Sequence, residues 1–235
     1  MNIHKCIKII DLCLYLKKEK ILVIGDVHIG YEEALNKQGI LMPRFQFPEL
    51  IKRLEKIVKD LEVKEVILIG DLKHEFGTIS ETEWRHTLQF LDFLFKFTKK
   101  IILIRGNHDT ILGPIADKRG LEIKDYYKVK DVYFCHGDLI SDDNDFKKSK
   151  IIVIGHEHPA VSLKERRVET YKCFLKGRWK RKILIVMPSF NLVTEGVDIL
   201  KEELLSPFLH QKLDDFDVYI VEDKVYEFGK LKNIK

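Results

Sequence analysis

The chain has 235 residues and a formal charge of +4, from 41 basic and 37 acidic residues. That length suits one large α/β domain, so we treat residues 1–235 as a single domain with a substantial core. The charge is too small, and its signs too evenly mixed, to indicate nucleic-acid binding by itself. Because there is no apolar run of about 18 residues and no signal-peptide core, we expect a cytoplasmic protein without membrane contact.

The first half of the chain alternates apolar strands with amphipathic helices. We expect a hairpin at 7–16, strands at 21–26, 66–71 and 101–105, and helices at 31–37, 48–60 and 80–97. Pro48 opens the second helix, and Ser80 with Glu83 forms a capping box that opens the third. Strand-helix-strand units of this length imply parallel strands whose carboxyl ends share one edge of a sheet.

The second half has shorter turns and fewer helical patterns. After a turn at Gly113-Pro114, we expect a short helix or coil and then strands at 132–138, 151–155, 161–163, 168–175, 183–187, 218–221 and 225–228. This spacing favours an antiparallel or mixed second sheet. Lys176-Gly177 is expected to turn one hairpin of that sheet.

Polar side chains follow the apolar strands in a repeated pattern. The segments are Gly25-Asp26-Val27-His28, Gly70-Asp71, Gly106-Asn107-His108-Asp109, His136-Gly137-Asp138 and Gly155-His156-Glu157-His158. One such segment alone would be an ordinary turn. Their recurrence at strand ends, with His74 close behind Asp71, indicates a shared site instead. Asp26 and His28 are two residues apart, so both can face that site while Val27 points into the core.

The candidate ligands are carboxylates, imidazoles and an amide, with no thiolate. They are Asp26, His28, Asp71, Asn107, His136, His156 and His158. This chemistry suits Mn most, with Fe, Zn or Ni as alternatives, and the set is too large for one ion. Two divalent ions about 3.5 to 4 Å apart, sharing a bridging carboxylate, would clamp an in-line displacement at phosphorus. The four cysteines show no Cys-x-x-Cys pair and are expected to be buried thiols.

Taken in order, the five segments resemble the motifs of the calcineurin-like metallophosphoesterases. The resemblance covers residues 26–158 and implies an α/β fold, a four-layer αββα sandwich of two mostly parallel or mixed sheets flanked by helices. Residues 70–77 and 155–159 look most like an uncharacterised archaeal and ligase-associated branch, which is related to a DNA-repair nuclease subunit.

The resemblance also implies roles for the site residues. Asp26, His28, Asp71 and His158 would hold one metal, and Asp71, Asn107, His136 and His156 the other. A hydroxide between the metals would attack phosphorus. His108 would protonate the leaving oxygen, with Asp109 orienting its ring.

The sequence departs from many phosphatases of the family after Asp71, where it has Lys73, His74 and Glu75. Lys73 or His74 would contact the substrate phosphate, or would pair with Glu75 outside the site. Arg105 is a further candidate for substrate binding, and Arg44 a weaker one.

These residues predict a phosphoesterase that acts on phosphodiesters or nucleic acid. The alternatives are a phosphomonoesterase and a non-catalytic scaffold that binds a partner protein, and a homo-oligomer is compatible with each. The basic run 176–182 contains Trp179 beside arginines and lysines, a pairing that stacks bases and neutralises phosphates. It would guide a nucleic acid or a partner protein toward the metals, or it is a solvated hairpin end whose Trp packs on its own strand.

Overall fold

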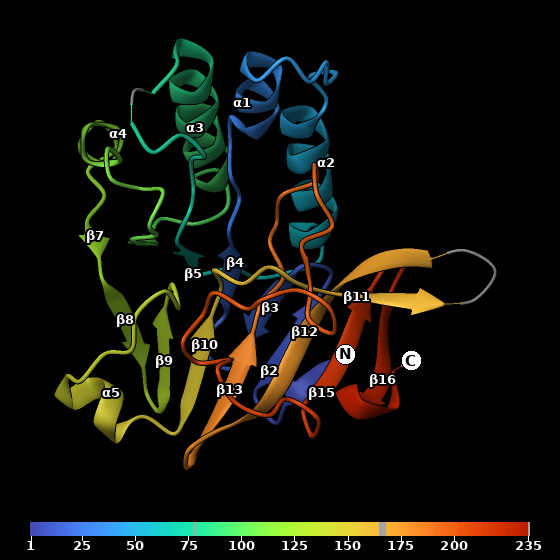
Figure 1. Ribbon diagram of the computed structural model, residues 1–235. Helices are drawn as coiled ribbons and strands as arrows, with labels where there is room; N and C mark the ends of the chain where they lie inside the picture. The colour runs from blue at the N-terminus through green and yellow to red at the C-terminus, as the bar shows by residue number, and fades with distance from the viewer. Residues whose placement is uncertain (78, 165–167, 235) are drawn as a thin grey trace.

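The computed structural model describes residues 1–77, 79–164 and 168–234, and two β-sheets form its centre (Figure 1). The first sheet has the strand order β1-β2-β3-β4-β5-β6-β7. Its strands are β1 (Asn2–His4), β2 (Ile7–Ile10), β3 (Cys13–Leu16), β4 (Ile21–Gly25), β5 (Glu65–Ile69), β6 (Ile101–Ile104) and β7 (Ile123–Lys124). The predicted hairpin is confirmed as β2 and β3, and β4, β5, β6 and β7 pair in parallel as the crossovers require.

The helices of the first half lie against this sheet. They are α1 (Tyr31–Lys37), α2 (Gln46–Val58), α3 (Glu81–Leu94) and α4 (Gly113–Asp117), and Figure 1 shows them together at the top of the view. Apolar side chains of α2 and α3 join the same core as β4, β5 and β6. Gly113-Pro114 begins α4 instead of forming the predicted turn, because Pro fits the first turn of a helix.

The second sheet has the order β14-β11-β12-β13-β10-β9-β8, with β15 beside β12 and β16 beside β15. Its strands are β8 (Tyr126–Val129), β9 (Val132–Cys135), β10 (Ile151–Ile154), β11 (Pro159–Lys164), β12 (Val168–Trp179), β13 (Lys182–Val186), β14 (Val197–Asp198), β15 (Asp217–Val221) and β16 (Val225–Lys230). The predicted mixed sheet is confirmed, since β10 is parallel to β9 and β13 while β12 is antiparallel to β13. Strands β7 and β8 occupy a region where we expected a helix or coil.

The core divides at the second sheet, because alternate residues of its strands point to opposite faces. Ile151 and Val153 of β10 belong to the cluster between the two sheets, whereas Ile152 and Ile154 belong to a cluster on the outer face. That outer face is covered by α5 (Asn144–Lys148), the segment 199–216 and the 3-10 helix η1 (Leu231–Asn233). The fourth layer is therefore largely irregular chain. No helix in the described part of the chain is long and apolar enough to cross a membrane.

The basic run 176–182 forms a hairpin end, as predicted, but the turn does not fall at Lys176-Gly177. Lys176 and Gly177 pair with β13 inside β12, and the chain turns at Lys180-Arg181. Trp179 is 7% exposed and its ring packs 5.7 Å from Phe146 and 5.2 Å from Phe208, so the prediction that it stacks on bases was wrong. The turn precedes β13, which runs parallel to β10, so it lies at the end of the sheet opposite residues 155–158.

Candidate metal centre

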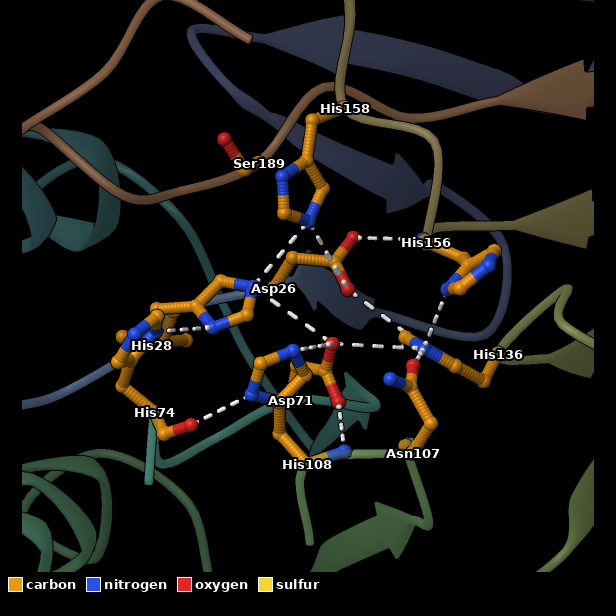
Figure 2. A network of polar contacts seen from close by, with 12 residues as sticks. Asp26, His28, Asp71, His74, Asn107, His108, His136, His156, His158 and Ser189 are labelled. Atoms are coloured by element: carbon orange, nitrogen blue, oxygen red, sulfur yellow. Dashed lines mark hydrogen bonds and ion pairs between the residues drawn. The ribbon is translucent and has the colours of Figure 1, made fainter. Parts of the chain in front are cut away.

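The loops at the carboxyl ends of strands from both sheets bring the predicted ligands together (Figure 2). Asp26 and His28 follow β4, Asp71 follows β5, Asn107 and His108 follow β6, His136 follows β9, and His156 and His158 follow β10. The buried apolar strands fix these loops, since β4, β5, β6, β9 and β10 are buried along their whole length.

The atoms of the predicted ligands form two groups that share one carboxylate, and a third group is His28, His74 and His108. One group is Asp26, His28, Asp71 and His158, the other is Asp71, His136 and His156, and within each group the ligand atoms lie within 4.8 Å of one another. Asp71 Oδ2 is 3.6 Å from His28 Nε2 and 3.5 Å from His136 Nε2. Asn107 Oδ1 lies 2.8 Å from His136 Nε2 and adds an amide oxygen to the second group.

In Asp26 and Asp71, one carboxylate oxygen accepts a hydrogen bond from a backbone amide and the other faces the centre. The amide N–H of His156 donates to Asp26 Oδ2 at 3.0 Å, and that of His108 donates to Asp71 Oδ1 at 2.9 Å. Asp26 Oδ1 has no hydrogen-bond partner among the described residues and lies 3.6 Å from His158 Nε2. The free oxygens therefore face the imidazole nitrogens with which they would share a cation.

The backbone of the site is strained where the ligands are. Positive φ angles occur at Asp26, His28, Asp71, His156 and His158, at 48°, 49°, 40°, 66° and 51°. A non-glycine residue in this region costs about 1 kcal/mol or more, and such strain concentrates at functional sites. Five strained residues in one cluster indicate that the ligand geometry is imposed by the surrounding fold.

Glycines precede the ligands because side chains from other strands occupy the space beside them. A Cβ atom at Gly70 would lie 2.0 Å from His136 Nδ1, and one at Gly155 would lie 2.3 Å from Asp26 Oδ2. The Gly-Asp and Gly-His pairs of the sequence are thus a packing requirement of the site.

The buried carboxyl groups and imidazoles of the cluster indicate a cation-binding site. Burial, together with the neighbouring Asp26 and Asp109 carboxyls, raises the pKa of Asp71 to about 9. Burial also raises the pKa of Asp26 well above its usual range and lowers the pKa of His158 to about 3. Buried carboxylates are stable only when a positive charge compensates them, and neutral imidazole is the form that binds metal. The residues present therefore fit divalent ions.

His108 is oriented by the loop after β5. Its Nδ1–H donates to the carbonyl oxygen of His74, which leaves Nε2 as the nitrogen facing the centre, 4.0 Å from Asp71 Oδ2. Its ring packs on Phe76 with centroids 3.7 Å apart.

Asp109 does not orient His108, so that prediction was wrong. Its carboxylate accepts from the amide N–H groups of Gly106, Leu72 and Lys73, at 3.1, 3.1 and 3.4 Å. These bonds fasten the loop after β5 to the loop after β6. The His74 carbonyl takes the role we had assigned to Asp109.

Two of the predicted substrate-binding residues, Lys73 and His74, contact other groups of the protein. Lys73 is fully buried, and its ammonium donates to the carbonyl oxygens of Glu75 and His108. His74 Nδ1 lies 3.3 Å from His28 Nδ1, and its ring stacks on Tyr31 at 4.2 Å. Lys73 thus fixes the loop that carries His108, whereas His74 backs the ring of a predicted ligand.

Glu83 is a site residue that the sequence did not reveal. It was expected to close a capping box, and Ser80 Oγ does accept from the Glu83 amide at 3.1 Å. The Glu83 carboxylate, however, accepts from the amides of His74 and Glu75 at 2.8 and 3.0 Å. It thereby anchors the loop that orients His108, through a contact that leaves no local signal in the sequence.

A cleft of about 470 Å³ opens beside the second ligand group. Asn107 and His136 line it, and so do Arg105, Tyr126, Asp138 and Leu139. Arg105 keeps its side chain 58% exposed, with Nε 3.9 Å from Asp125 Oδ1. Of the predicted substrate-binding residues Lys73, His74 and Arg105, Arg105 therefore lies in the cleft and remains open to a ligand.

Two layers of mixed sheet and a histidine–aspartate cluster at their shared edge define a metal-binding phosphoesterase fold. Residues 19–220 match the family model described as calcineurin-like phosphoesterase, and the chain belongs to this family. No match to the chain was found among curated proteins.

Solved structures similar to the chain include two of known or stated activity class. The Pseudomonas putida nuclease MPE is 19% identical with a TM-score of 0.67, over 93% of this chain and 92% of that one. The E. coli phosphoesterase Yfce is 13% identical with a TM-score of 0.41, over 86% of this chain and 88% of that one. The first likeness confirms the fold of the two-sheet sandwich.

Proposed function

We propose that the protein hydrolyses phosphodiesters, nucleic acid among them, at a dinuclear metal centre. The observation that carries the proposal is Asp71, whose carboxylate belongs to both ligand groups. Asp26, His28 and His158 would complete one metal site, and Asn107, His136 and His156 the other. Mn is the ion we expect, because oxygen and imidazole ligands without thiolate suit it.

When bound, two such ions supply Lewis-acid stabilisation of the phosphoryl oxygens and a water molecule of lowered pKa. The chain itself supplies the proton for the leaving group. For this step His108 is the imidazolium: its Nδ1–H stays on the His74 carbonyl, and its Nε2–H faces the centre and is the proton given to the leaving oxygen. Lys73 and Asp109 keep that geometry by tying the loop after β5 to the loop after β6, and Glu83 by tying the loop after β5 to α3.

The charges around the cleft favour a diester over a monoester. Arg105 is the one cationic side chain among the described residues that line the cleft, and Asp125 and Asp138 line it too. A phosphomonoester carries nearly two negative charges at neutral pH, whereas a diester carries one. The acidic residues therefore penalise the monoester more. The fold of the P. putida nuclease gives further support for a nucleic-acid substrate.

The test compares two substrates on one preparation. Purified protein is loaded with Mn, the bound metal is counted, and hydrolysis of bis-p-nitrophenyl phosphate and p-nitrophenyl phosphate is measured. We expect two Mn ions and faster diester hydrolysis, both lost after EDTA treatment. Faster monoester hydrolysis would favour a phosphomonoesterase. Two bound ions without hydrolysis of either compound would favour the scaffold.

A further inference from the structure

We propose that the cleft beside the second ligand group binds the nucleoside that stays on the phosphate after cleavage. The inference rests on the proposed function and narrows its substrate class to esters of nucleotides, as in a nucleic-acid strand. A volume of about 470 Å³ suits one such group, since ligand sites usually measure about 300 to 1,000 Å³.

The cleft has an apolar wall next to a charged centre. Leu139 and Ile140 come directly after the segment His136-Gly137-Asp138, and they are 74% and 44% exposed. Adjacent large aliphatic side chains left in solvent beside a site indicate a surface that a ligand covers. A group with an apolar face is needed there, which a small polar alcohol lacks.

The cleft also has an aromatic ring in a fixed position. Tyr126 lines it and stacks on Tyr133, with centroids 4.7 Å apart and planes 17° from parallel. Tyr133 is 1% exposed, and its hydroxyl donates to Asp143 at 2.6 Å. A ring backed in this way loses little entropy when it packs against a base, and base–aromatic contacts tolerate any sequence.

Arg105 adds a cation at the mouth of the same cleft. Its ion pair with Asp125 is long at 3.9 Å, and Asp125 is itself 86% exposed. Because the guanidinium is not held by a close carboxylate, it is free to contact the next phosphate of a strand. An apolar wall, an aromatic ring and the exposed Arg105 guanidinium together match a nucleoside followed by a phosphate.

The position of His108 decides which side of the scissile bond enters the cleft. Figure 2 shows His108 beside His74, with Asn107 and His136 on the other side of Asp71. His108 protonates the leaving oxygen in the proposed reaction, and it does not line the cleft, whereas Asn107 and His136 do. The leaving group therefore departs on the His108 side, and the group retained on phosphorus occupies the cleft.

The test holds the leaving group constant and changes the retained group. The Mn-loaded protein is given methyl p-nitrophenyl phosphate and the p-nitrophenyl esters of thymidine 5′- and 3′-monophosphate. We expect kcat/KM for the better thymidine ester to exceed that for the methyl ester about tenfold or more, the range of one base–aromatic contact. Titration calorimetry with thymidine monophosphates and methyl phosphate measures the same preference without turnover.

Two variants connect the preference to the cleft. Leu139→Ser together with Ile140→Ser, and separately Tyr126→Leu, should reduce the thymidine-to-methyl ratio in both measurements. Leu41→Ser is the matched control, because Leu41 is 92% exposed and lies outside the cleft lining. Thermal unfolding of each variant shows whether it folds.

The outcomes separate this inference from the proposed function. Equal affinity of the wild-type protein for thymidine monophosphates and methyl phosphate would overturn the nucleoside cleft, even if all esters were hydrolysed. An unchanged ratio in both cleft variants would overturn it as well. Tight thymidine monophosphate binding that the cleft variants lose, in a protein that hydrolyses no ester, would support the cleft and refute the proposed function.

Discussion

Replacing Gly70 by alanine tests whether packing around His136 assembles the centre. Gly70 has φ +63°, and an added Cβ would lie 2.0 Å from His136 Nδ1. Gly120 is a matched control, since its φ is +62° and nothing lies within 4 Å of its would-be Cβ. Both substitutions incur the left-handed backbone cost of about 1 kcal/mol. Only Gly70→Ala must also displace a buried imidazole, and overpacking costs about 1 to 3 kcal/mol more.

The two variants should therefore differ in stability and in metal content. With about 2 kcal/mol between them, the metal-free Gly70→Ala protein should melt about 4 to 8 °C below Gly120→Ala. Gly70→Ala should also lose Mn from the site that contains His136, whereas Gly120→Ala should keep the wild-type content. Calorimetric melting with EDTA and elemental metal analysis measure both quantities. Equal melting temperatures together with equal Mn content would refute the packing argument.

Three further predictions concern the centre itself. Asp71→Asn should impair binding of both ions, because a shared carboxylate neutralises part of the positive charge of the two ions and a neutral amide does not. Full Mn content by elemental analysis would contradict this. His108→Ala should keep both ions and slow hydrolysis of an alkyl phosphodiester about a hundredfold, and loss of metal or an unchanged rate would contradict its role as acid. Without metal, stability should fall as pH rises from about 6.5 to 8, because folded Asp71, with its pKa raised to about 9, keeps a proton that the unfolded carboxyl has lost. Mn affinity should rise over the same window, since binding releases that proton. The window stops at pH 8 because Lys172, whose pKa burial lowers to about 8, acts in the opposite sense above it. A metal-free melting temperature that does not change over this window would count against the assigned pKa of Asp71.

The strands and the polar segments after them could be predicted because both are local features. Apolar runs such as Ile101–Ile104 are too short for helices and too apolar for exposed strands, so burial fixes them as central strands. Crossover connections make such strands parallel, and parallel strands bring their carboxyl ends to one edge. The convergence of Asp26, Asp71 and Asn107 follows from that geometry alone.

The partners of individual polar groups depended on contacts between distant segments. Asp109 accepts from Leu72 and Lys73, and Glu83 from His74, through loops whose approach is set by sheet packing. An aspartate or glutamate side chain can orient a histidine ring, accept hydrogen bonds from a loop or bind a metal. Its neighbours in the sequence do not show which of these it does.

The sequence by itself determined the central strands that carry the site and the polar segments that follow them. The tertiary structure alone decided how far β12 extends and where its side chains point. Lys176 and Gly177 resemble a turn, yet they remain in β12 because that strand has hydrogen-bond partners on both sides, in β13 and β15. Trp179 resembles a base-stacking residue, yet α5 and the segment 199–216 bury its ring. Strand pairing and side-chain burial stabilise the fold through many contacts between segments far apart in the chain. Together these contacts outweigh the local conformational preference of a few residues.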